Sequence, residues 1–197
     1  MARGRPRTFD RAAALRQATM LFWQYGYEGT SVAELTKRMG INAPSLYSAF
    51  GDKRTLFDEV VETYGQSFGS FVAVALQEEA TAREAFARVL REAAAVYTDP
   101  EHPAGCLVIS ATTNVSPKDD DVADAMRELR RSNLDGFRER VETDVAAGRL
   151  PAGTDAHALA VYYATVVQGM SQQARDGAST ADLEAVAELA MASWPAV

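Results

Sequence analysis

The sequence predicts an all-α protein with a three-helix head at the N-terminus, a larger helical body behind it, and about nine helices in total. Strand patterns are nearly absent, because β-branched residues are scattered instead of alternating with polar ones. Alanine-rich apolar stripes recur at three- and four-residue spacing, and helix-capping residues interrupt them at helix-length intervals. The chain has 197 residues, of which 47% are apolar, so it can bury a small domain joined to a larger one.

The head begins with a helix that Thr8 or Asp10 can cap and that ends at Gly26. The apolar residues of this helix repeat every three or four positions, which places them on one side. They are Leu15, Ala18, Phe22 and Tyr25.

Two short helices around a tight turn follow. Ser31 is a natural N-cap, and Glu34, three residues later, completes a capping box. Gly40 ends this helix. Asn42 can cap the next one, and Pro44 falls in its first turn, where a missing N–H costs nothing. Two short helices joined by a glycine turn are the arrangement of a helix-turn-helix.

The body contains the remaining helices, all of them long except a short, buried one that begins at Cys106. We expect them at about residues 52–78, 81–98, 106–115, 117–148, 154–175 and 180–194. The Asp99-Pro100 pair ends the second of them. We assign residues 1–8 to a basic arm, 9–55 to the head and 56–197 to the body. Head and body should be mechanically continuous, because the division falls at the fourth helix.

Charge is divided unevenly along the chain. Residues 1–54 contain nine Lys or Arg and four Asp or Glu, a balance of +5. The net charge of the whole chain is −7, so the remaining residues carry −12. A basic end on an acidic body indicates that contact with nucleic acid is confined to one end of the molecule.

The segment GYEGTSVAELTKRMGINAPSLYSAFGDKRTLF, with the aromatic LFWQYGY at its start, resembles the DNA-binding signature of the TetR family of transcriptional repressors. The resemblance covers roughly residues 9 to 60. The chain departs from the family at Thr36, where alanine is common, and at Ala49, where histidine is common. The resemblance implies a homodimer whose three-helix heads bind operator DNA and whose C-terminal domain binds a small ligand.

The second short helix, about residues 43–50, is expected to lie in the major groove, which is about 12 Å wide and admits one helix. The candidate base readers are at its N-terminal end: Asn42, Ala43, Pro44 and Ser45. These small or apolar groups suit thymine methyl contacts and DNA shape, because no Arg or Gln is present for bidentate hydrogen bonds.

Backbone contacts should position the head on the duplex. Thr30 and Ser31 lie at a helix N-terminus, where N–H groups suit a phosphate. The resemblance implies that Tyr47 and Lys53 are the strongest phosphate contacts. The alternative for Tyr47 is a partly buried packing role.

The basic arm contains Arg3, Arg5 and Arg7 around a Gly-Arg-Pro sequence. An extended arginine arm can enter a narrow minor groove, where the negative potential is enhanced. The alternative is a solvated tail that does not touch DNA. If the arm binds, alanine at the three positions should flatten the salt dependence of operator affinity, by roughly one unit of slope for each phosphate that the arm no longer neutralises.

Catalytic patterns are missing from the sequence. There are two histidines, no Gly-x-Ser-x-Gly turn and no glycine-rich phosphate loop, so we expect neither an enzyme nor a cofactor. A single cysteine excludes an intrachain disulfide. No stretch approaches the roughly 20 apolar residues that cross a bilayer, so we expect a cytoplasmic protein without a membrane partner.

Aromatic and polar residues are mixed along the helices of the body, as in small-molecule sites. The candidate ligand residues are Phe68, Phe71, Phe86, Tyr97, Cys106, Asn114, Phe137, Tyr163 and Gln168. Each of them has core packing as its alternative. The last two helices carry more apolar surface than one core needs, and in the family they pair across a two-fold axis. The candidate dimer residues are Leu159, Tyr162, Val166, Met170, Leu183, Val186 and Leu189.

Cys106 is expected at the start of a short helix, where the helix dipole would lower the thiol pKa. We favour a buried, inert thiol. The alternatives are a redox or electrophile sensor, and a metal site with Glu101 and His102, although three residues in one loop are a weak metal signature.

The function that these observations favour is a homodimeric, sequence-specific repressor that binds a near-palindromic operator. An unknown small-molecule effector would release it. The alternatives are a regulator that senses oxidants or electrophiles through Cys106 and, further away, an enzyme on a helical fold.

Overall fold

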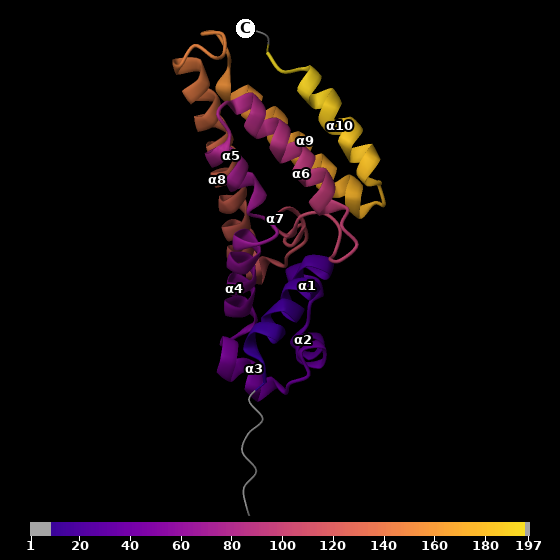
Figure 1. Ribbon diagram of the computed structural model, residues 1–197. Coiled ribbons are helices and arrows are strands. Elements are labelled where there is room, and N and C mark those ends of the chain that lie inside the picture. The colour runs from indigo at the N-terminus through magenta and orange to yellow at the C-terminus, as the bar shows by residue number, and fades with distance from the viewer. Residues whose placement is uncertain (1–8, 196–197) are drawn as a thin grey trace, which may run out of the picture.

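The computed structural model describes residues 9–195, which form ten α-helices and one short 3-10 helix and contain no strand. The predicted all-α class is confirmed. The elements are α1 (Arg11–Gly29), α2 (Val32–Met39), α3 (Ala43–Phe50), α4 (Lys53–Gln66), α5 (Phe71–Glu78), α6 (Ala82–Tyr97), α7 (Leu107–Ser110), η1 (Pro117–Asp119), α8 (Asp120–Ala146), α9 (Ala156–Arg175) and α10 (Thr180–Ala192). Figure 1 shows α1 to α3 as a small head at one end of a long helical body. None of these helices combines the length and the apolar character that a bilayer crossing requires.

Side-chain caps begin the head helices at the residues that the sequence indicates. The Asp10 carboxylate accepts a hydrogen bond from the first turn of α1 at 3.0 Å, and Ser31 and Glu34 form the predicted capping box. Asn42 caps α3 by accepting from the N–H of Ser45 at 2.9 Å. A cap of this kind stabilises a helix by about 1 kcal/mol, so local sequence decides where these helices start.

The backbone of α1 leaves helical geometry at Gly26, where φ is +74°. Glycine adopts this left-handed φ without the steric cost that other residues incur. The break turns the end of the helix, so that Tyr27 is 4% exposed while Tyr25 is 56% exposed. Gly26 is therefore the predicted end of the regular helix, but Tyr25 does not belong to its apolar face.

The fourth predicted helix consists of two helices, because residues 67–70 form a turn between α4 and α5. In this turn the Ser67 hydroxyl donates to the Thr63 carbonyl at 2.7 Å, and the N–H of Gly69 donates to the Tyr64 carbonyl at 2.8 Å. Hydroxyl groups that bond to the backbone compete with helical hydrogen bonds. The split accounts for ten helices where about nine were expected.

The body packs around α6, which contacts α5, α9 and α10. An aromatic cluster holds one end of it together. The ring of Phe86 on α6 lies 4.8 Å from Phe137 on α8, 5.0 Å from Tyr163 on α9 and 5.3 Å from Trp194, measured between centroids. Aromatic pairs at such distances contribute about 0.5–1.5 kcal/mol beyond the area they bury. The cluster therefore fixes three body helices and the C-terminal segment to one another.

A buried carboxylate joins the end of α8 to the start of α6. Asp144 is 1% exposed and accepts from the N–H of Ala82 at 2.6 Å. It also accepts from Nε and Nη2 of Arg149, at 2.9 and 2.7 Å. The helix dipole of α6 and the guanidinium both favour the negative charge at this position.

We expect Asp144→Ala to lower the free energy of unfolding by about 2–4 kcal/mol, because it removes these bonds and leaves buried donors without an acceptor. Urea denaturation followed by circular dichroism measures the change. Glu142→Ala, an exposed position on the same helix, is the control and should change stability by less than about 0.5 kcal/mol. Equal losses for the two variants would contradict the role of Asp144.

Candidate nucleic-acid interface and ligand cavity

The third helix of the head is anchored on one side and exposed on the other. Leu46 and Phe50 are 0% and 3% exposed, so they anchor this helix in the core. Pro44, Tyr47 and Ser48 are exposed on α3, Tyr47 by 49%. Figure 1 places this helix at the end of the molecule that is farthest from the body. An exposed helix in this position can enter a major groove.

The four predicted base readers lie around the start of α3. Asn42 and Pro44 are exposed, and Ala43 and Ser45 are half-buried. The side-chain oxygen of Asn42 is used in the cap, so its amide N–H groups are the part that can face a base. Ser48 is an exposed polar residue that was not among the predicted base readers. It follows Pro44 at i+4, so the two residues share one face of the helix. Base contacts by these residues stay a prediction.

Arg11 on α1 holds α3 against α4. Its Nε and Nη2 donate to the carbonyl oxygen of Ala49 at 3.3 and 3.2 Å, near the C-terminal end of α3. The same guanidinium pairs with both carboxylate oxygens of Glu59 on α4, at 2.6 and 2.7 Å. It also lies 4.5 Å from the ring centroid of Phe50. Arg11 therefore connects α1, α3 and α4 at one point.

We expect Arg11→Gln to weaken operator binding about tenfold, because losing these charge-assisted bonds, on the order of 1.4 kcal/mol, lets α3 move relative to α4. Fluorescence anisotropy with labelled operator measures the affinity. Arg16→Gln removes the same charge from an exposed site of α1 and is the control. A similar loss in both variants would mean that Arg11 acts only through its charge.

The structure corrects one of the two residues predicted to contact phosphate at the start of α2. Thr30 is 1% exposed, and its hydroxyl donates to the carbonyls of Gly26 and Leu21 at 2.7 and 3.3 Å, so it lies below the surface that a duplex can reach. Ser31 is exposed, but its N–H donates to the Glu34 carboxylate at 3.0 Å. A phosphate would have to displace this carboxylate. The Ser31 contact stays a prediction.

Lys53 opens α4 and is half-buried. Its Nζ lies 4.2 Å from the ring centroid of Tyr27, a cation–π arrangement that directs the side chain along the head surface. Burial lowers the pKa of Lys53, and the carboxylates of Glu28 and Asp119 oppose that shift. Its contact with phosphate, like that of the exposed Tyr47, stays a prediction.

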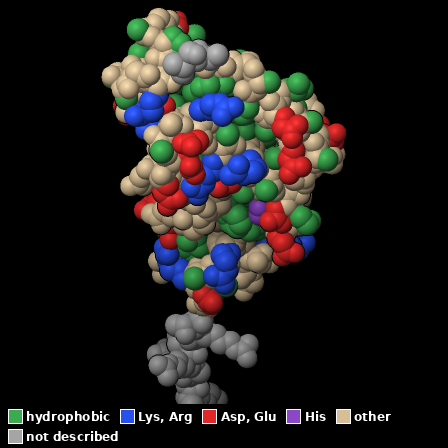
Figure 2. Space-filling model, turned by 45° about the horizontal axis from the view of Figure 1, so that its top comes forward, with side chains coloured by type: hydrophobic (Ala, Val, Ile, Leu, Met, Phe, Trp, Pro, Cys, Tyr) green, Lys and Arg blue, Asp and Glu red, His purple; other side chains and the backbone are tan. Residues whose placement is uncertain are grey.

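Much of the positive charge of the N-terminal end lies outside the described residues. Residues 9–54 contain six Lys or Arg and four Asp or Glu, a balance of +2. The predicted contacts of Arg3, Arg5 and Arg7 fall in residues 1–8, which the structure does not describe. In Figure 2, basic side chains flank the end of the head, whereas basic and acidic side chains alternate over the body.

A cavity of about 530 Å³ lies inside the body, between α4, α5, α6, α8, α9 and the segment that contains α7. Most of its lining is apolar. Five of the nine predicted ligand residues line it: Phe71, Tyr97, Cys106, Phe137 and Gln168. Its volume lies within the range of cavities that bind drug-sized molecules.

The other four predicted ligand residues do not line this cavity. Phe68 belongs to the turn between α4 and α5 and packs against Trp23 at a centroid distance of 5.1 Å. Phe86 and Tyr163 belong to the aromatic cluster of the core. Asn114 is exposed in the loop after α7. Helical spacing in the sequence marks an apolar face but does not say whether a core or a cavity covers it, which explains these corrections.

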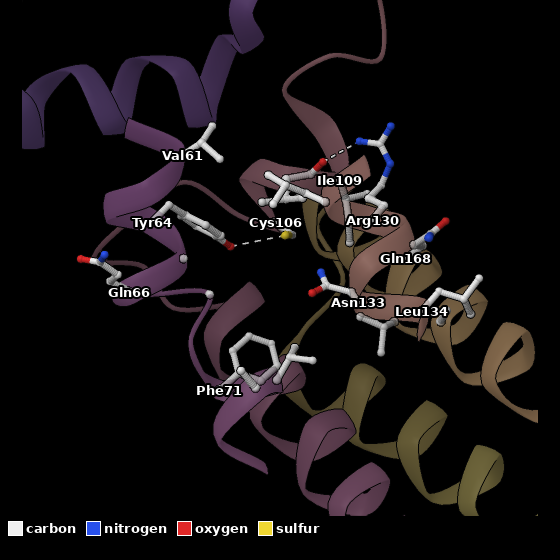
Figure 3. Close-up of a pocket in the computed structure, with 18 of the residues that line it drawn as sticks. Val61, Tyr64, Gln66, Phe71, Cys106, Ile109, Arg130, Asn133, Leu134 and Gln168 are labelled. Atoms are coloured by element: carbon white, nitrogen blue, oxygen red, sulfur yellow. Dashed lines mark hydrogen bonds between the residues drawn. The ribbon is translucent and has the colours of Figure 1, made fainter. Parts of the chain in front are cut away.

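Several cavity residues were missed. Val61 and Tyr64 reach the cavity from α4, and Arg130, Asn133 and Leu134 reach it from α8 (Figure 3). The three α8 residues follow one another at i, i+3 and i+4, so they share one face of an amphipathic helix. Two polar residues inside an otherwise apolar stripe were the signal in the sequence that could have indicated a lining.

The environment of Cys106 differs from the expected one. The residue is 9% exposed, and the Tyr64 hydroxyl donates to its Sγ at 3.4 Å (Figure 3). Burial raises the pKa of the Cys106 thiol, and this outweighs the hydrogen bonds that lower it. The expectation of a lowered pKa is therefore corrected, because α7 has four residues and desolvation dominates.

The loop before Cys106 does not form a metal site. His102 stacks on Trp23 at a centroid distance of 4.4 Å, whereas the Cys106 thiol faces the cavity. Among residues 9–195 no three side chains of His, Cys, Asp or Glu lie close enough to share a metal ion.

The last two helices carry an exposed apolar surface. Three of the predicted dimer residues are exposed, by 43%, 38% and 74%: Tyr162, Val186 and Leu189. Leu159 and Val166 are half-buried. Met170 and Leu183 are each 1% exposed, so they pack inside the monomer and are removed from the predicted interface. An apolar patch of this kind on a helical body indicates a protein–protein contact.

A helix-turn-helix head with an exposed third helix, attached to a helical body that encloses a cavity, defines a DNA-binding transcriptional regulator. Residues 14–60 match the family model described as bacterial regulatory proteins, tetR family. Residues 79–190 match the model described as tetracyclin repressor-like, C-terminal domain. The chain belongs to the TetR family of transcriptional regulators.

Similar proteins support this assignment. The repressor ComR of Escherichia coli K12 is 36% identical over 195 residues, covering 98% of this chain and 93% of ComR. The repressor BdcR of the same strain is 34% identical over 187 residues, covering 95% of this chain and 90% of BdcR. A solved structure of a cysteine mutant of the TetR family regulator CifR, complexed with 26-bp operator DNA, is 44% identical, with a TM-score of 0.92 and coverage of 97% and 100%. These relatives are regulators and not enzymes.

Proposed function

We propose that the chain forms a homodimer that represses transcription from a near-palindromic operator, and that a small molecule in the cavity releases it. The observation that carries the proposal is the position of α4. Its first residue, Lys53, belongs to the surface of the head, whereas Val61 and Tyr64 on the same helix line the cavity. A ligand that moves α4 would therefore change the spacing of two heads on DNA.

A second connection supports the proposal. The carbonyl of Gly105 accepts from Trp23 Nε1 at 3.1 Å, and the carbonyl of Ala111 accepts from the N–H of Tyr27 at 2.8 Å. Between these two attachments to α1, Cys106 and Ile109 line the cavity. The segment 105–111 thus contacts both the head and the ligand space. Release requires that the ligand bind the DNA-free state more tightly than the DNA-bound state.

The proposed dimer rests on the exposed apolar surface of α9 and α10. The relatives support a repressor, since ComR and BdcR carry that name. The proposal includes a cytoplasmic location, because a regulator of chromosomal DNA acts there. The division between head and body at residue 55 stays a prediction, because α4 runs unbroken across it.

Footprinting of the upstream region of its own gene tests the proposal. We expect one protected near-palindrome and a loss of at least about tenfold in affinity for Tyr47→Ala, because a phosphate contact from the exposed face of α3 is removed. Tyr25→Ala removes the other exposed tyrosine of the head, off this face, and should bind normally. Uniform weak binding to every duplex, unchanged by Tyr47→Ala, would overturn the proposal.

One observation favours the alternative of a thiol sensor, namely that Cys106 lines the cavity and can meet a reagent that enters it. The raised thiol pKa acts against it, because the thiolate is the reactive form. The test is operator release by hydrogen peroxide in the unmodified chain and in Cys106→Ser. Release that disappears in the variant, with operator affinity intact, would establish the sensor. Equal behaviour of the two proteins would exclude it.

A further inference from the structure

We propose that the cavity selects a neutral, largely apolar molecule with one hydrogen-bond-accepting oxygen, of the ketone, ester or ether class, and that Tyr64 and Tyr97 donate to this oxygen. The inference rests on the proposed function in one respect, that the cavity is the effector site. It adds the chemical class of the effector.

At the inner end of the cavity, the hydroxyls of two tyrosines face the sulfur of Cys106, which is a weak hydrogen-bond acceptor. Tyr64 and Tyr97 are each 1% exposed, and both line the cavity. The Tyr64 hydroxyl donates to the Sγ of Cys106 at 3.4 Å, and the Tyr97 hydroxyl faces the same sulfur. Sulfur accepts hydrogen bonds weakly, so an oxygen placed here would satisfy both donors better.

The two phenols stay neutral, so each can donate a hydrogen bond but neither carries a charge. Burial raises the pKa of both hydroxyls far above the physiological range, so they stay protonated. Among the cavity residues that the structure describes, Arg130 is the one cationic side chain. Arg130 donates to the carbonyl of Val108 at 2.8 Å, and Figure 3 shows its guanidinium directed away from Tyr64 and Phe71. A carboxylate placed beside the two tyrosines would therefore lose its hydration without an ion pair to a guanidinium directed at it, whereas a neutral oxygen loses little.

The remainder of the lining requires an apolar skeleton. Around the tyrosine pair the walls consist mainly of Val61, Phe71, Ile109, Leu134, Phe137 and Val167. A ligand gains roughly 25 cal/mol for each Å² of apolar surface buried against such walls. The carboxylates of Asp58 and Glu62 are also part of the lining, and they disfavour an anionic ligand. The lining around the tyrosine pair fits a molecule with an apolar skeleton and an acceptor oxygen, and Asn133 and Gln168 also line the cavity.

The probe for the test is 2-octanone, compared with octanoate and with 2-methyl-1-octene, in which a CH₂ group replaces the carbonyl oxygen. Isothermal titration with the full chain measures binding. We expect the ketone to bind at least about tenfold more tightly than either comparison compound. Tyr64→Phe and Tyr97→Phe should each weaken the ketone about fivefold, the effect of one neutral hydrogen bond, and leave the alkene unchanged.

Tyr163→Phe is the matched control, because it removes a buried hydroxyl that donates to the carbonyl of Ala190 at 3.0 Å, outside the cavity. Its ketone affinity should be unchanged. Cys106→Ala should not weaken the ketone either, since sulfur is the competitor for the donors and not the group that recognises the ligand. Infrared spectra of carbonyl-labelled 2-octanone add a direct measurement. The carbonyl stretch should shift to lower frequency in the unmodified chain and lose that shift in the Tyr64→Phe, Tyr97→Phe double variant.

Tighter binding of octanoate than of the ketone, abolished in Arg130→Gln, would overturn the inference and indicate an anionic effector. An affinity for 2-octanone that is the same in both tyrosine variants as in the unmodified chain would also overturn the inference. So would the absence of binding up to the solubility limit of 2-octanone. Operator binding is measured in parallel. Ketone binding without operator release would contradict the proposed switch and leave the ligand class standing. Normal operator binding, with release by a compound whose affinity is unchanged in the Tyr64→Phe and Tyr97→Phe variants, would support the proposed switch and contradict the proposed ligand class.

Discussion

Gly105→Ala is expected to lower the free energy of unfolding by about 3 kcal/mol or more. Gly105 has φ of +78°, a conformation that costs other residues roughly 1–2 kcal/mol. A Cβ at this position would lie 2.7 Å from the carbonyl oxygen of Ser171 and 2.9 Å from Cγ of Arg175, both on α9. Backbone cannot give way as a flexible side chain does, so the overpacking adds about 1–3 kcal/mol.

Gly105 forms hydrogen bonds to both the head and the body, so the substitution should affect both. Its N–H donates to the carbonyl of Tyr97 at 2.9 Å, and its own carbonyl accepts from Trp23 Nε1 at 3.1 Å. We therefore expect the variant to lose thermal stability and operator affinity together. Guanidinium denaturation and fluorescence anisotropy measure the two effects.

Gly148→Ala is the matched control for this prediction. Gly148 has a similar φ of +70°, but nothing lies within 4 Å of an added Cβ. It should lose only the roughly 1–2 kcal/mol of the conformational cost. Equal stability of the two glycine variants would mean that the close approach of Gly105 to α9 has no energetic consequence, and that the contact is looser than described.

Leu189→Arg is expected to convert the proposed dimer into a monomer and to lower operator affinity by at least about a hundredfold. Leu189 is 74% exposed, and Val186 on α10 and Tyr162 on α9 are exposed as well. An arginine there would bury an unpaired charge in the interface, which costs several kcal/mol. A monomer can occupy only one half of a near-palindrome and loses the affinity that the second head adds.

Sedimentation velocity and operator anisotropy on the same samples test this expectation. Glu184→Gln is the control, because it raises the charge by the same unit on α10 but lies five residues away, on the other flank of the helix. It should remain dimeric and bind normally. A Leu189→Arg variant that stays dimeric would place the interface elsewhere. A monomeric variant with full operator affinity would contradict the need for two heads.

The head could be predicted in more detail than the body, and the reason is physical. Ser31, Glu34 and Asn42 act through hydrogen bonds to residues three positions away, so a short window of sequence contains the whole interaction. The turn that separates α4 from α5 escaped prediction, because Ser67 can face solvent in a helix or bond to the backbone. Packing of the body decides between these two states.

The ligand site shows the same limit. Phe71 and Phe86 look alike in the sequence, both aromatic on apolar helix faces, yet one lines the cavity and the other fills the core. Which of the two occurs depends on the helix that lies opposite. That helix comes from a distant part of the chain, so neither periodicity nor composition contains the answer.

By itself the sequence determined the helical class, the starts of the head helices, the division of charge and the family resemblance. Caps, periodicity and charge are properties of short stretches of chain, and that is why they could be read. The tertiary structure alone decided that Thr30 and Met170 are buried, that Tyr64 and Tyr97 meet at Cys106, and that the thiol pKa is raised. Burial and desolvation depend on neighbours that folding brings from tens of residues away, so no local pattern could contain them.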